Sequence, residues 1–322
     1  MRKLMWMGGL AAPVLCMAMA AAQSYPNRPV RIIVPYAAGG GTDLNARPVA
    51  QKLTERWGQS VVVENRSGGN AMIGTDAVAK APPDGYTILF HASSEIVTNV
   101  SLFKKVPYDP VRDFAPVTLA STTPVIIVTH PSVPVKTIKQ LIALAKARPA
   151  ALSYASVGTA SPQHLAGEML KAAVHISMEH IPFKGAAPAL IDVLGGHVPV
   201  GFIALLPTVP HVNSGRLTAL AVTTAKRSGA LPAVPTMMEA GFREFELAQW
   251  YGVLVPAATP KEIVAKLTAD FVWALTLPEV KDRFTKDGCD VVASSAEQLA
   301  AYIKTEISKN ARIIKAANVR VE

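Results

Sequence analysis

One stretch of the chain decides its fold class: VRIIV at residues 30–34, followed by PYAAGGGTD at residues 35–43. The first segment is apolar apart from Arg31, which is typical of a strand buried inside a sheet. Residues 43–57 then repeat apolar side chains at helical spacing, and Gly58 suits the end of that helix. A buried strand, a glycine-rich loop and a helix in this order predict a parallel α/β unit.

The same alternation continues along the chain. The patterns predict further strands at 61–63, 87–90, 125–128, 152–155, 179–182, 198–202, 217–222 and 250–255, and helices at 71–80, 138–147, 162–173, 187–194, 261–275 and 296–316. Parallel strands joined by crossover helices make two α/β units, followed by a C-terminal helical segment. Ligands of such sheets bind at the carboxyl ends of the strands, so the loops at those ends are the candidate sites.

Length and composition limit the possible classes of protein. A chain of 322 residues with 50% hydrophobic and 17% charged residues suits two globular domains and excludes a disordered chain. The formal net charge is +9, but the basic residues form no run longer than two, which argues against a nucleic-acid partner and favours anionic ligands. The sequence contains no recognisable metal motif, nucleotide motif or pair of catalytic carboxylates, so we expect no metal, cofactor or catalytic residue.

Residues 1–22 have the pattern of a secretory signal peptide. Arg2 and Lys3 precede a short apolar segment, and an A-x-A cleavage pattern ends at Ala22. Cleavage near this position predicts an exported protein. It would leave Cys289 as the single cysteine, which cannot form a disulfide within the chain.

The glycine-rich loop at 36–41 is the first candidate site. Its glycines allow a ligand to approach the backbone closely, and the following helix directs N–H groups and a partial positive charge at the loop. Thr42 is expected to cap this helix, and Pro48 is expected to kink it. The loop lacks the glycine spacing of nucleotide-binding motifs, which favours a small anion; a tight turn without a ligand is the alternative.

The second candidate loop, at 154–164, also joins a strand to a helix. Ser156, Thr159 and Ser161 supply hydroxyl groups, and Ser161 suits the N-cap of the helix. Ser161 and His164 leave open a Ser/His hydrolase, although no nucleophile elbow or orienting acid accompanies them. A histidine bonded to the backbone is the alternative for His164.

Two further loops carry polar groups. Ser93 and Ser94 follow the strand at 87–90 and place hydroxyls at the same edge of the sheet. Lys184, in the loop at 182–188, could meet an anion. An ordinary serine-rich turn and a solvated lysine are the alternatives.

Several blocks of sequence together carry a family signature. They read, in order, YPNRPVRIIVP (25–35) with GG-x-TD after it, APPDGYTIL (81–89), VPYDPVRDFAPV (106–117), S-x-x-HLAGE (161–168), FKGAAPAL (183–190) with LGG (194–196), and WYGVLVPA (250–257) with TP (259–260). In this order they resemble the Bug-type receptors, which are the periplasmic substrate-binding proteins of tripartite tricarboxylate transporters. The likeness extends over the whole chain after residue 22.

The resemblance implies a fold. It is the α/β, two-lobed periplasmic binding protein (Venus flytrap) fold, with mostly parallel sheets and two crossing strands. Lobe 1 would comprise residues 23–122 and 248–322, and lobe 2 residues 123–247. A hinge in the crossing segments near 120–124 and 248–252 would let the lobes close on a ligand.

The resemblance also implies a function. A monomeric receptor, rather than an enzyme, would capture a small carboxylate and deliver it transiently to membrane permease subunits. Backbone N–H groups, hydroxyls and ordered waters would hold the ligand. The residues expected to line this site are Tyr36, Ala38, Gly39, Gly40, Gly41, Thr42, Asp43, Ser93, Ser94, Ser156, Thr159, Ala160, Ser161, His164, Ile203 and Ala204. A receptor that presents its ligand to a signalling partner is an alternative that the sequence leaves open.

The pair Ile203-Ala204 departs from the family, which usually has polar residues at this place. If both side chains face the cleft, the wall of lobe 2 is apolar. A polar group buried there without a partner would cost about 1–3 kcal/mol, whereas an apolar body would gain from burial. This departure predicts a carboxylate with an apolar or aromatic body.

Overall fold

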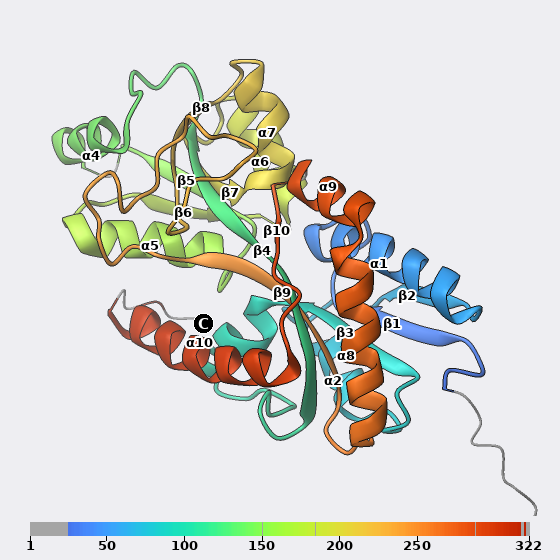
Figure 1. Cartoon of the computed structure of the whole chain (residues 1–322). Helices are drawn as coiled ribbons and strands as arrows, with labels where there is room; N and C mark the ends of the chain where they lie inside the picture. The colour runs from blue at the N-terminus through green and yellow to red at the C-terminus, as the bar shows by residue number, and fades with distance from the viewer. Residues whose placement is uncertain (1–24, 150, 184, 287, 317–318, 320–322) are drawn as a thin grey trace, which may run out of the picture.

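The computed structural model describes residues 25–149, 151–183, 185–286, 288–316 and 319 (Figure 1). The signal peptide predicted at 1–22 lies outside these residues. No helix within the described part of the chain is both long enough and apolar enough to cross a membrane.

The strands form one mixed sheet in the order β2-β1-β3-β9-β4-β7-β5-β6, and β8 and β10 each pair with β4. Their bounds are β1 (Val30–Val34), β2 (Val61–Asn65), β3 (Thr87–Ala92), β4 (Phe114–Thr129), β5 (Ser153–Ser156), β6 (Glu179–Pro182), β7 (Val200–Ala204), β8 (Thr218–Val222), β9 (Ala248–Pro256) and β10 (Asp290–Val291).

Helices cover both faces of this sheet (Figure 1). Their bounds are α1 (Gly41–Trp57), α2 (Met72–Ala79), the π-helix η1 (Ser94–Thr98), α3 (Asn99–Leu102), α4 (Ile138–Ala147), α5 (Pro162–Val174), α6 (Ala186–Leu194), α7 (Leu205–Asn213), α8 (Lys261–Thr276), α9 (Pro278–Lys286) and α10 (Ala296–Ala316).

Two long strands, β4 and β9, run between the two halves of the molecule (Figure 1). We call the half that contains β1, β2 and β3 lobe 1, and the half that contains β5, β6 and β7 lobe 2. The outer strands of each lobe pair in parallel, as expected. β4 and β9 pair antiparallel with each other because the chain enters lobe 2 along one and leaves along the other. The sheet is therefore mixed rather than mostly parallel.

Each lobe buries its own core against both faces of its sheet. In lobe 1, Leu53 of α1 and Phe271 of α8 pack on one face, and Ile96 of η1 packs on the other. In lobe 2, Leu165 of α5 lies in one core layer and Val193 of α6 in the opposite layer. Two cores of this kind make each lobe a compact unit, and the crossing strands are the covalent links between them.

The C-terminal helix α10 packs against both lobes. Leu299 and Ile303 belong to a core cluster of lobe 1, whereas Ile314 belongs to a core cluster of lobe 2. The hydroxyl of Thr98 donates a hydrogen bond of 3.3 Å to Oδ1 of Asn310, also on this helix. The predicted boundaries assign all of α10 to lobe 1, but its last turns contact lobe 2. The boundaries themselves stay a prediction.

Several elements were missed by the sequence patterns. They are η1 with α3, the helices α7 and α9, the strand β10, and the first part of β4. Prolines obscured two of them, because Pro210 lies inside α7 and Pro116 and Pro124 lie inside β4. Proline disfavours helix interiors and central strands, so local propensity argued against elements that tertiary packing forms.

The start of α1 differs from expectation. The helix begins after Gly40, which provides no side-chain cap, so Thr42 lies inside the first turn instead of capping it. The helix also continues through Pro48. Gly58 ends it in the left-handed conformation, as expected. An N-terminus without a side-chain cap leaves its first N–H groups available to another acceptor.

Candidate functional site

A cavity of about 190 Å³ lies where the two lobes face each other. Lobe 1 contributes Tyr36, Gly40, Gly41, Thr42, Asn70, Ser94 and Asn99; lobe 2 contributes Val157, Gly158, Thr159, Ser161, Pro162, Gln163, Gly185, Ala186 and Ala204; and β9 contributes Gln249 and Tyr251. None of these lining residues carries a charged side chain. Any charge complementary to an anion must therefore come from N–H groups and other dipoles.

Four of the longer helices begin at the wall of this cavity. Gly40 and Gly41 start α1, Ser161 and Pro162 start α5, Ala186 starts α6, and Ala204 is the N-cap residue of α7. Each helix N-terminus carries a partial positive charge and N–H groups without an intrahelical acceptor. Their convergence from both lobes suits a small anion without any lysine or arginine in the wall.

Asp43 holds the first loop in shape from behind. Its Oδ2 accepts hydrogen bonds from Gly39 N (2.9 Å) and Arg47 Nε (2.8 Å), and its Oδ1 accepts one from Asn65 Nδ2 (3.0 Å). Burial acts to raise the pKa of Asp43, but the hydrogen bonds from Arg47, Gly39 and Asn65 outweigh it and keep this pKa below its ordinary value. Gly39 has a φ of +78°, which favours glycine. Both residues shape the loop and lie behind the cavity wall.

Gly41, the third glycine of the loop, is packed closely against the side chain of Tyr251. A Cβ on Gly41 would overlap the hydroxyl of Tyr251, whereas Gly39 has no atom within 4 Å of such a Cβ. Asn45 Nδ2 donates a hydrogen bond of 2.8 Å to the Gly41 carbonyl and so holds that residue in place. The contact between the loop and β9 therefore depends on the absence of a side chain at residue 41.

A buried acid lies behind Tyr36. The Tyr36 hydroxyl donates a hydrogen bond of 2.6 Å to Glu95 Oε2, and Ala92 N donates one of 2.9 Å to Glu95 Oε1. Burial raises the pKa of Glu95 to about 7, despite these hydrogen bonds. Glu95 thus positions Tyr36, which lines the cavity, and Glu95 itself changes charge near neutral pH.

The second loop is organised by its own hydrogen bonds. Ser161 Oγ accepts from His164 N (3.2 Å), which is the N-cap predicted from the sequence, and donates to the Gly158 carbonyl (2.6 Å). His164 Nδ1 accepts from Ala160 N (3.2 Å), and Ala160 has a φ of +68°. Burial lowers the pKa of His164, which favours the neutral ring that this acceptor role requires. His164 is therefore bonded to the backbone.

The geometry does not support the Ser/His hydrolase alternative. Among the hydrogen bonds of the described residues, none joins the hydroxyl of Ser161 to the ring of His164, because each is bound to the backbone. The His164 ring instead stacks on His180, with ring centroids 3.9 Å apart. His180 Nε2 lies 2.7 Å from Ser156 Oγ, and neither residue lines the cavity. These side chains brace the loop from inside lobe 2.

The structure divides the predicted site residues into two groups. Those that line the cavity are Tyr36, Gly40, Gly41, Thr42, Ser94, Thr159, Ser161 and Ala204. Those that lie outside its lining are Ala38, Gly39, Asp43, Ser93, Ser156, Ala160, His164 and Ile203. Ile203 is fully buried in a core cluster of lobe 2, so only Ala204 presents an apolar surface. The argument for an apolar ligand body required both side chains, and its premise is therefore wrong.

Further lining residues were missed by sequence reasoning. Asn70 lies in the loop after the strand β2. A polar residue in a loop at the carboxyl end of a parallel strand could have been predicted to line the cavity. Asn99 begins a helix that the patterns missed, and Gln249 and Tyr251 belong to a crossing strand. These three side chains reach the cavity only through tertiary structure. Lys184, a fourth-loop candidate, lies outside the described residues, although its neighbour Gly185 lines the cavity.

A chain of hydrogen bonds links lobe 2 to the crossing strand at the floor of the cavity. Gln163 Nε2 donates to Gln249 Oε1 (2.8 Å), and Gln249 Nε2 donates to the Tyr251 hydroxyl (3.0 Å). Gln163 is fully buried, and its Oε1 has no hydrogen-bond partner among the described residues. We call Gln163, Gln249 and Tyr251 the amide relay.

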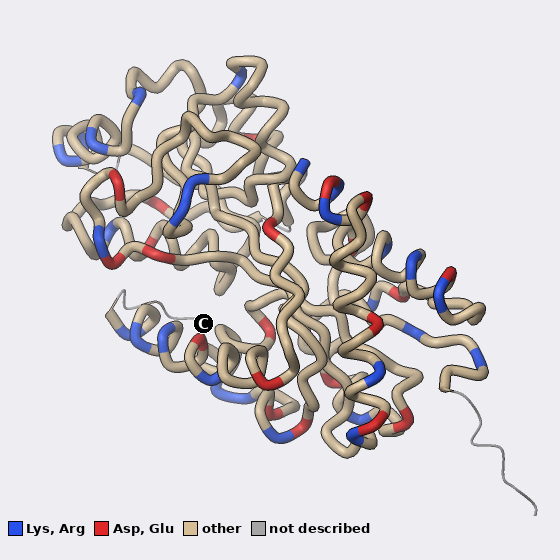
Figure 2. The backbone as a smooth tube through the Cα atoms, viewed as in Figure 1, with Lys and Arg blue, Asp and Glu red and all other residues tan. Residues whose placement is uncertain are grey.

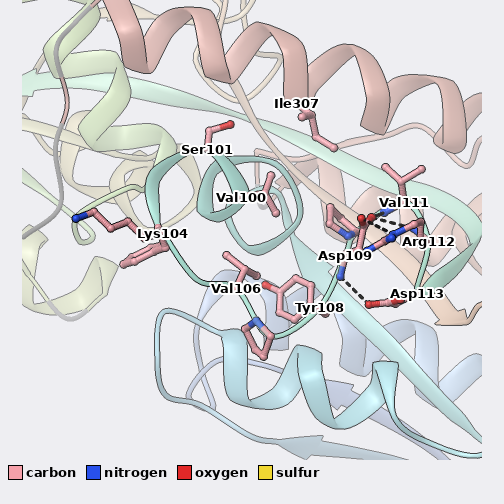
Figure 3. A pocket seen from close by; sticks show the side chains of 13 residues that line it. Val100, Ser101, Lys104, Val106, Tyr108, Asp109, Val111, Arg112, Asp113 and Ile307 are labelled. Atoms are coloured by element: carbon pink, nitrogen blue, oxygen red, sulfur yellow. Dashed lines mark hydrogen bonds and ion pairs between the residues drawn. The ribbon is translucent and has the colours of Figure 1, made fainter.

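A separate hollow of about 610 Å³ lies beside α10, between Lys104 and Asp113 (Figure 3). Its polar groups are bound to one another: Arg112 Nε donates to Asp109 Oδ2 (2.8 Å), and Asp109 N donates to Asp113 Oδ2 (2.7 Å). Figure 3 shows these side chains turned toward each other within the turn. The hollow therefore offers less for a ligand than the cavity between the lobes.

The charged residues are dispersed over the surface. Figure 2 shows lysine and arginine on the outer helices of both lobes, mixed with acidic residues along several of them. Many are paired locally, as Lys80 is with Asp76 and Arg227 with Glu239. Exposed pairs of this kind contribute little to stability. Because the charges are dispersed, the surface does not concentrate positive charge at one place, and the helix N-termini at the cavity between the lobes are the better candidate for binding an anion.

Several known proteins resemble this chain in sequence and in fold. The sequence profile described as "Tripartite tricarboxylate transporter family receptor" matches residues 45–319. Protein BugT of Bordetella pertussis is 36% identical over 315 residues, which are 98% of this chain and 95% of that protein. The structure of R. palustris Rpa4515 with adipate has a TM-score of 0.87 at 34% identity and covers 92% of this chain and 99% of that one. MatC from Rhodopseudomonas palustris with bound malate has a TM-score of 0.82 at 30% identity and covers 90% and 100%.

Proposed function

Because the chain belongs to the tripartite tricarboxylate transporter family of receptors, we propose that it captures a small carboxylate between its lobes and delivers it to a permease of that transporter type. The family consists of periplasmic substrate-binding receptors and not of enzymes. Family membership is shown, and three details are our proposal. They are the carboxylate as ligand, the permease subunits as partners, and export to the periplasm by a signal peptide at 1–22.

One observation carries the choice of a carboxylate: a cavity without charged side chains at which four helix N-termini meet. The start of α1 has no side-chain cap, so its first N–H groups need an acceptor from outside the helix. A carboxylate supplies two acceptor oxygens and the negative charge that the helix termini favour. Adipate and malate, in the structures of two relatives, are acids of this size class.

The arrangement of donors supports capture between the two lobes. α1 lies in lobe 1, whereas α5 and α6 lie in lobe 2, so neither lobe alone surrounds a ligand. We expect the lobes, as predicted at 23–122 with 248–322 and at 123–247, to close by bending β4 and β9. Closure expels water and brings both sets of N–H groups onto the ligand, which gives the closed form its differential affinity.

A thermal-shift screen of purified protein against small carboxylates tests this function. A carboxylate at 100 times its Kd should stabilise the protein by about 2.7 kcal/mol, which is a readily measured shift in Tm. The matched control is the amide of each acid that shifts the Tm, because it keeps the shape and removes the charge. Stabilisation by the amides as strong as by the acids, or no response to any acid, would exclude a carboxylate receptor.

A further inference from the structure

The cavity contains hydrogen-bond acceptors that a carboxylate cannot satisfy. Gln163 Oε1, from lobe 2, and Asn99 Oδ1, from lobe 1, are buried oxygens without a hydrogen-bond partner among the described residues. Both residues are fully buried and both line the cavity. A buried acceptor left unpaired is costly, so such an atom at the wall of a binding cavity points to a donor on the ligand.

The orientation of Gln163 is held by the amide relay. Its Nε2 donates to Gln249 Oε1, and Gln249 in turn donates to Tyr251, so the NH₂ group of Gln163 is directed at β9. The same arrangement holds at Asn99, whose Nδ2 donates to the Asn70 carbonyl at 2.8 Å. In each amide the donor end is used by the protein, and the acceptor end is left over.

We propose that Gln163 is a specificity residue, whose Oε1 accepts a hydrogen bond from a hydroxyl or amino group on the ligand, so that the receptor prefers hydroxy- or amino-substituted acids to unsubstituted ones. This inference rests on the proposed carboxylate function and adds a second recognition element to it. The helix N-termini hold the carboxylate, and the amide relay reads the substituent beside it.

The preference has an expected size. Gln163 Oε1 is closed to solvent and unpaired in the structure, so an unsubstituted acid would leave it unpaired, whereas the hydroxy acid would supply the missing hydrogen bond. We expect a discrimination of about ten-fold or more in Kd, since sites built to bond a hydroxyl reject analogues that lack it. Ala204 in the same wall accommodates the carbon skeleton of either acid.

The test uses pairs of acids that differ by one hydroxyl group. Isothermal titration calorimetry of the wild-type protein compares malate with succinate, 2-hydroxyglutarate with glutarate, and mandelate with phenylacetate. In at least one pair the hydroxy acid should bind about ten-fold more tightly. Gln163→Met, which keeps the length of the side chain and removes the amide, should reduce that ratio to about three-fold or less.

Two further variants keep the test decisive. Gln51→Met changes an exposed glutamine of α1 and should keep the wild-type ratio. Gln249→Met leaves Gln163 in place but removes the acceptor that orients it, so the ratio should fall here too, even if Gln163→Met fails to fold. Equal binding within every pair, or an unchanged ratio in the folded Gln163 or Gln249 variant, would overturn the inference and leave the carboxylate function standing. If no acid of any pair binds the wild-type protein, the proposed function fails and the inference with it.

Discussion

The hydroxyl of Tyr251 lies against the backbone of Gly41, so closely that a Cβ at residue 41 would overlap it. Tyr251 belongs to the crossing strand β9, and Gly41 is the first residue of α1. The loop that carries the first set of N–H donors is therefore seated on the strand that links the lobes. This contact gives the glycine-rich loop a defined position relative to the crossing strand β9.

The first prediction concerns this contact. Gly41→Ala should destabilise the protein by about 1–3 kcal/mol and weaken carboxylate binding, because the added methyl displaces Tyr251 or the loop. The double variant Gly41→Ala with Tyr251→Phe should recover most of the stability, because it removes the overlapping oxygen. Gly229→Ala, where a Cβ has no atom within 4 Å, is the control and should behave as wild type in chemical denaturation. No recovery in the double variant would show that the overlap is not the cause.

The second prediction concerns pH and Glu95. Burial raises its pKa to about 7 from an ordinary value of 4.5, so the folded state keeps a proton that the unfolded state loses. Stability should therefore fall as the pH rises from about 4.5 to 7 and should change little from this source above that range. Carboxylate affinity should fall over the upper part of the same window, because ionised Glu95 lies behind Tyr36.

Denaturation curves and calorimetry between pH 5 and pH 8 measure both effects. Glu95→Gln should flatten the two pH profiles, since an amide has no charge to lose. Glu64→Gln, at a half-exposed position of β2, provides the control and should retain the slope of the wild type. A slope of the same size in Glu95→Gln would assign the pH dependence to another group.

The third prediction separates capping from binding. Ser161 and Thr137 both cap helices, α5 and α4, through hydrogen bonds of 3.2 Å to a backbone N–H. Replacing either by alanine should cost about 1 kcal/mol of unfolding free energy. Only Ser161 lines the cavity, so Ser161→Ala should also weaken carboxylate binding, whereas Thr137→Ala should leave affinity unchanged. Equal affinities in the two variants would place Ser161 outside the binding surface.

The fourth prediction concerns closure. Ligand should reduce the radius of gyration measured by small-angle X-ray scattering, through bending near residues 120–124 and 248–252 of the crossing strands. The register of β4 against β9 shifts between Leu119 and Ser121, and such an irregularity is a natural place for a bend. A constant radius in a sample whose ligand occupancy is verified by calorimetry would argue against closure.

The elements that carry the site were largely predictable from local sequence. The apolar segment at Val30–Val34 and the Ser161-Pro162 start of α5 are local signals, and the structure places them as predicted. Periodicity alone also recovered Glu179–Pro182 and Ala296–Ala316 with their observed bounds. Local signals suffice here because strand burial, helix capping and turn conformation depend on residues close together in the chain.

The composition of the cavity wall, in contrast, was decided by tertiary structure. His164 and Asp43 looked like ligand-binding groups from their positions in the loops, but their partners, the N–H groups of Ala160 and Gly39, direct them to the backbone. Ile203 lies in the core, although its neighbour Ala204 lines the cavity, because successive residues of a strand point to opposite faces of the sheet.

The sequence by itself determined the fold family and most of the loops that surround the cavity between the lobes. Only the tertiary structure brought Gln163, Gln249 and Tyr251 together, from a helix of lobe 2 and a crossing strand that are 86 residues apart at the Gln163–Gln249 contact. No local pattern encodes such a contact, because its geometry depends on how β9 passes between the lobes. The unpaired acceptor on Gln163, and with it the expected choice of ligand, exists only in the folded chain.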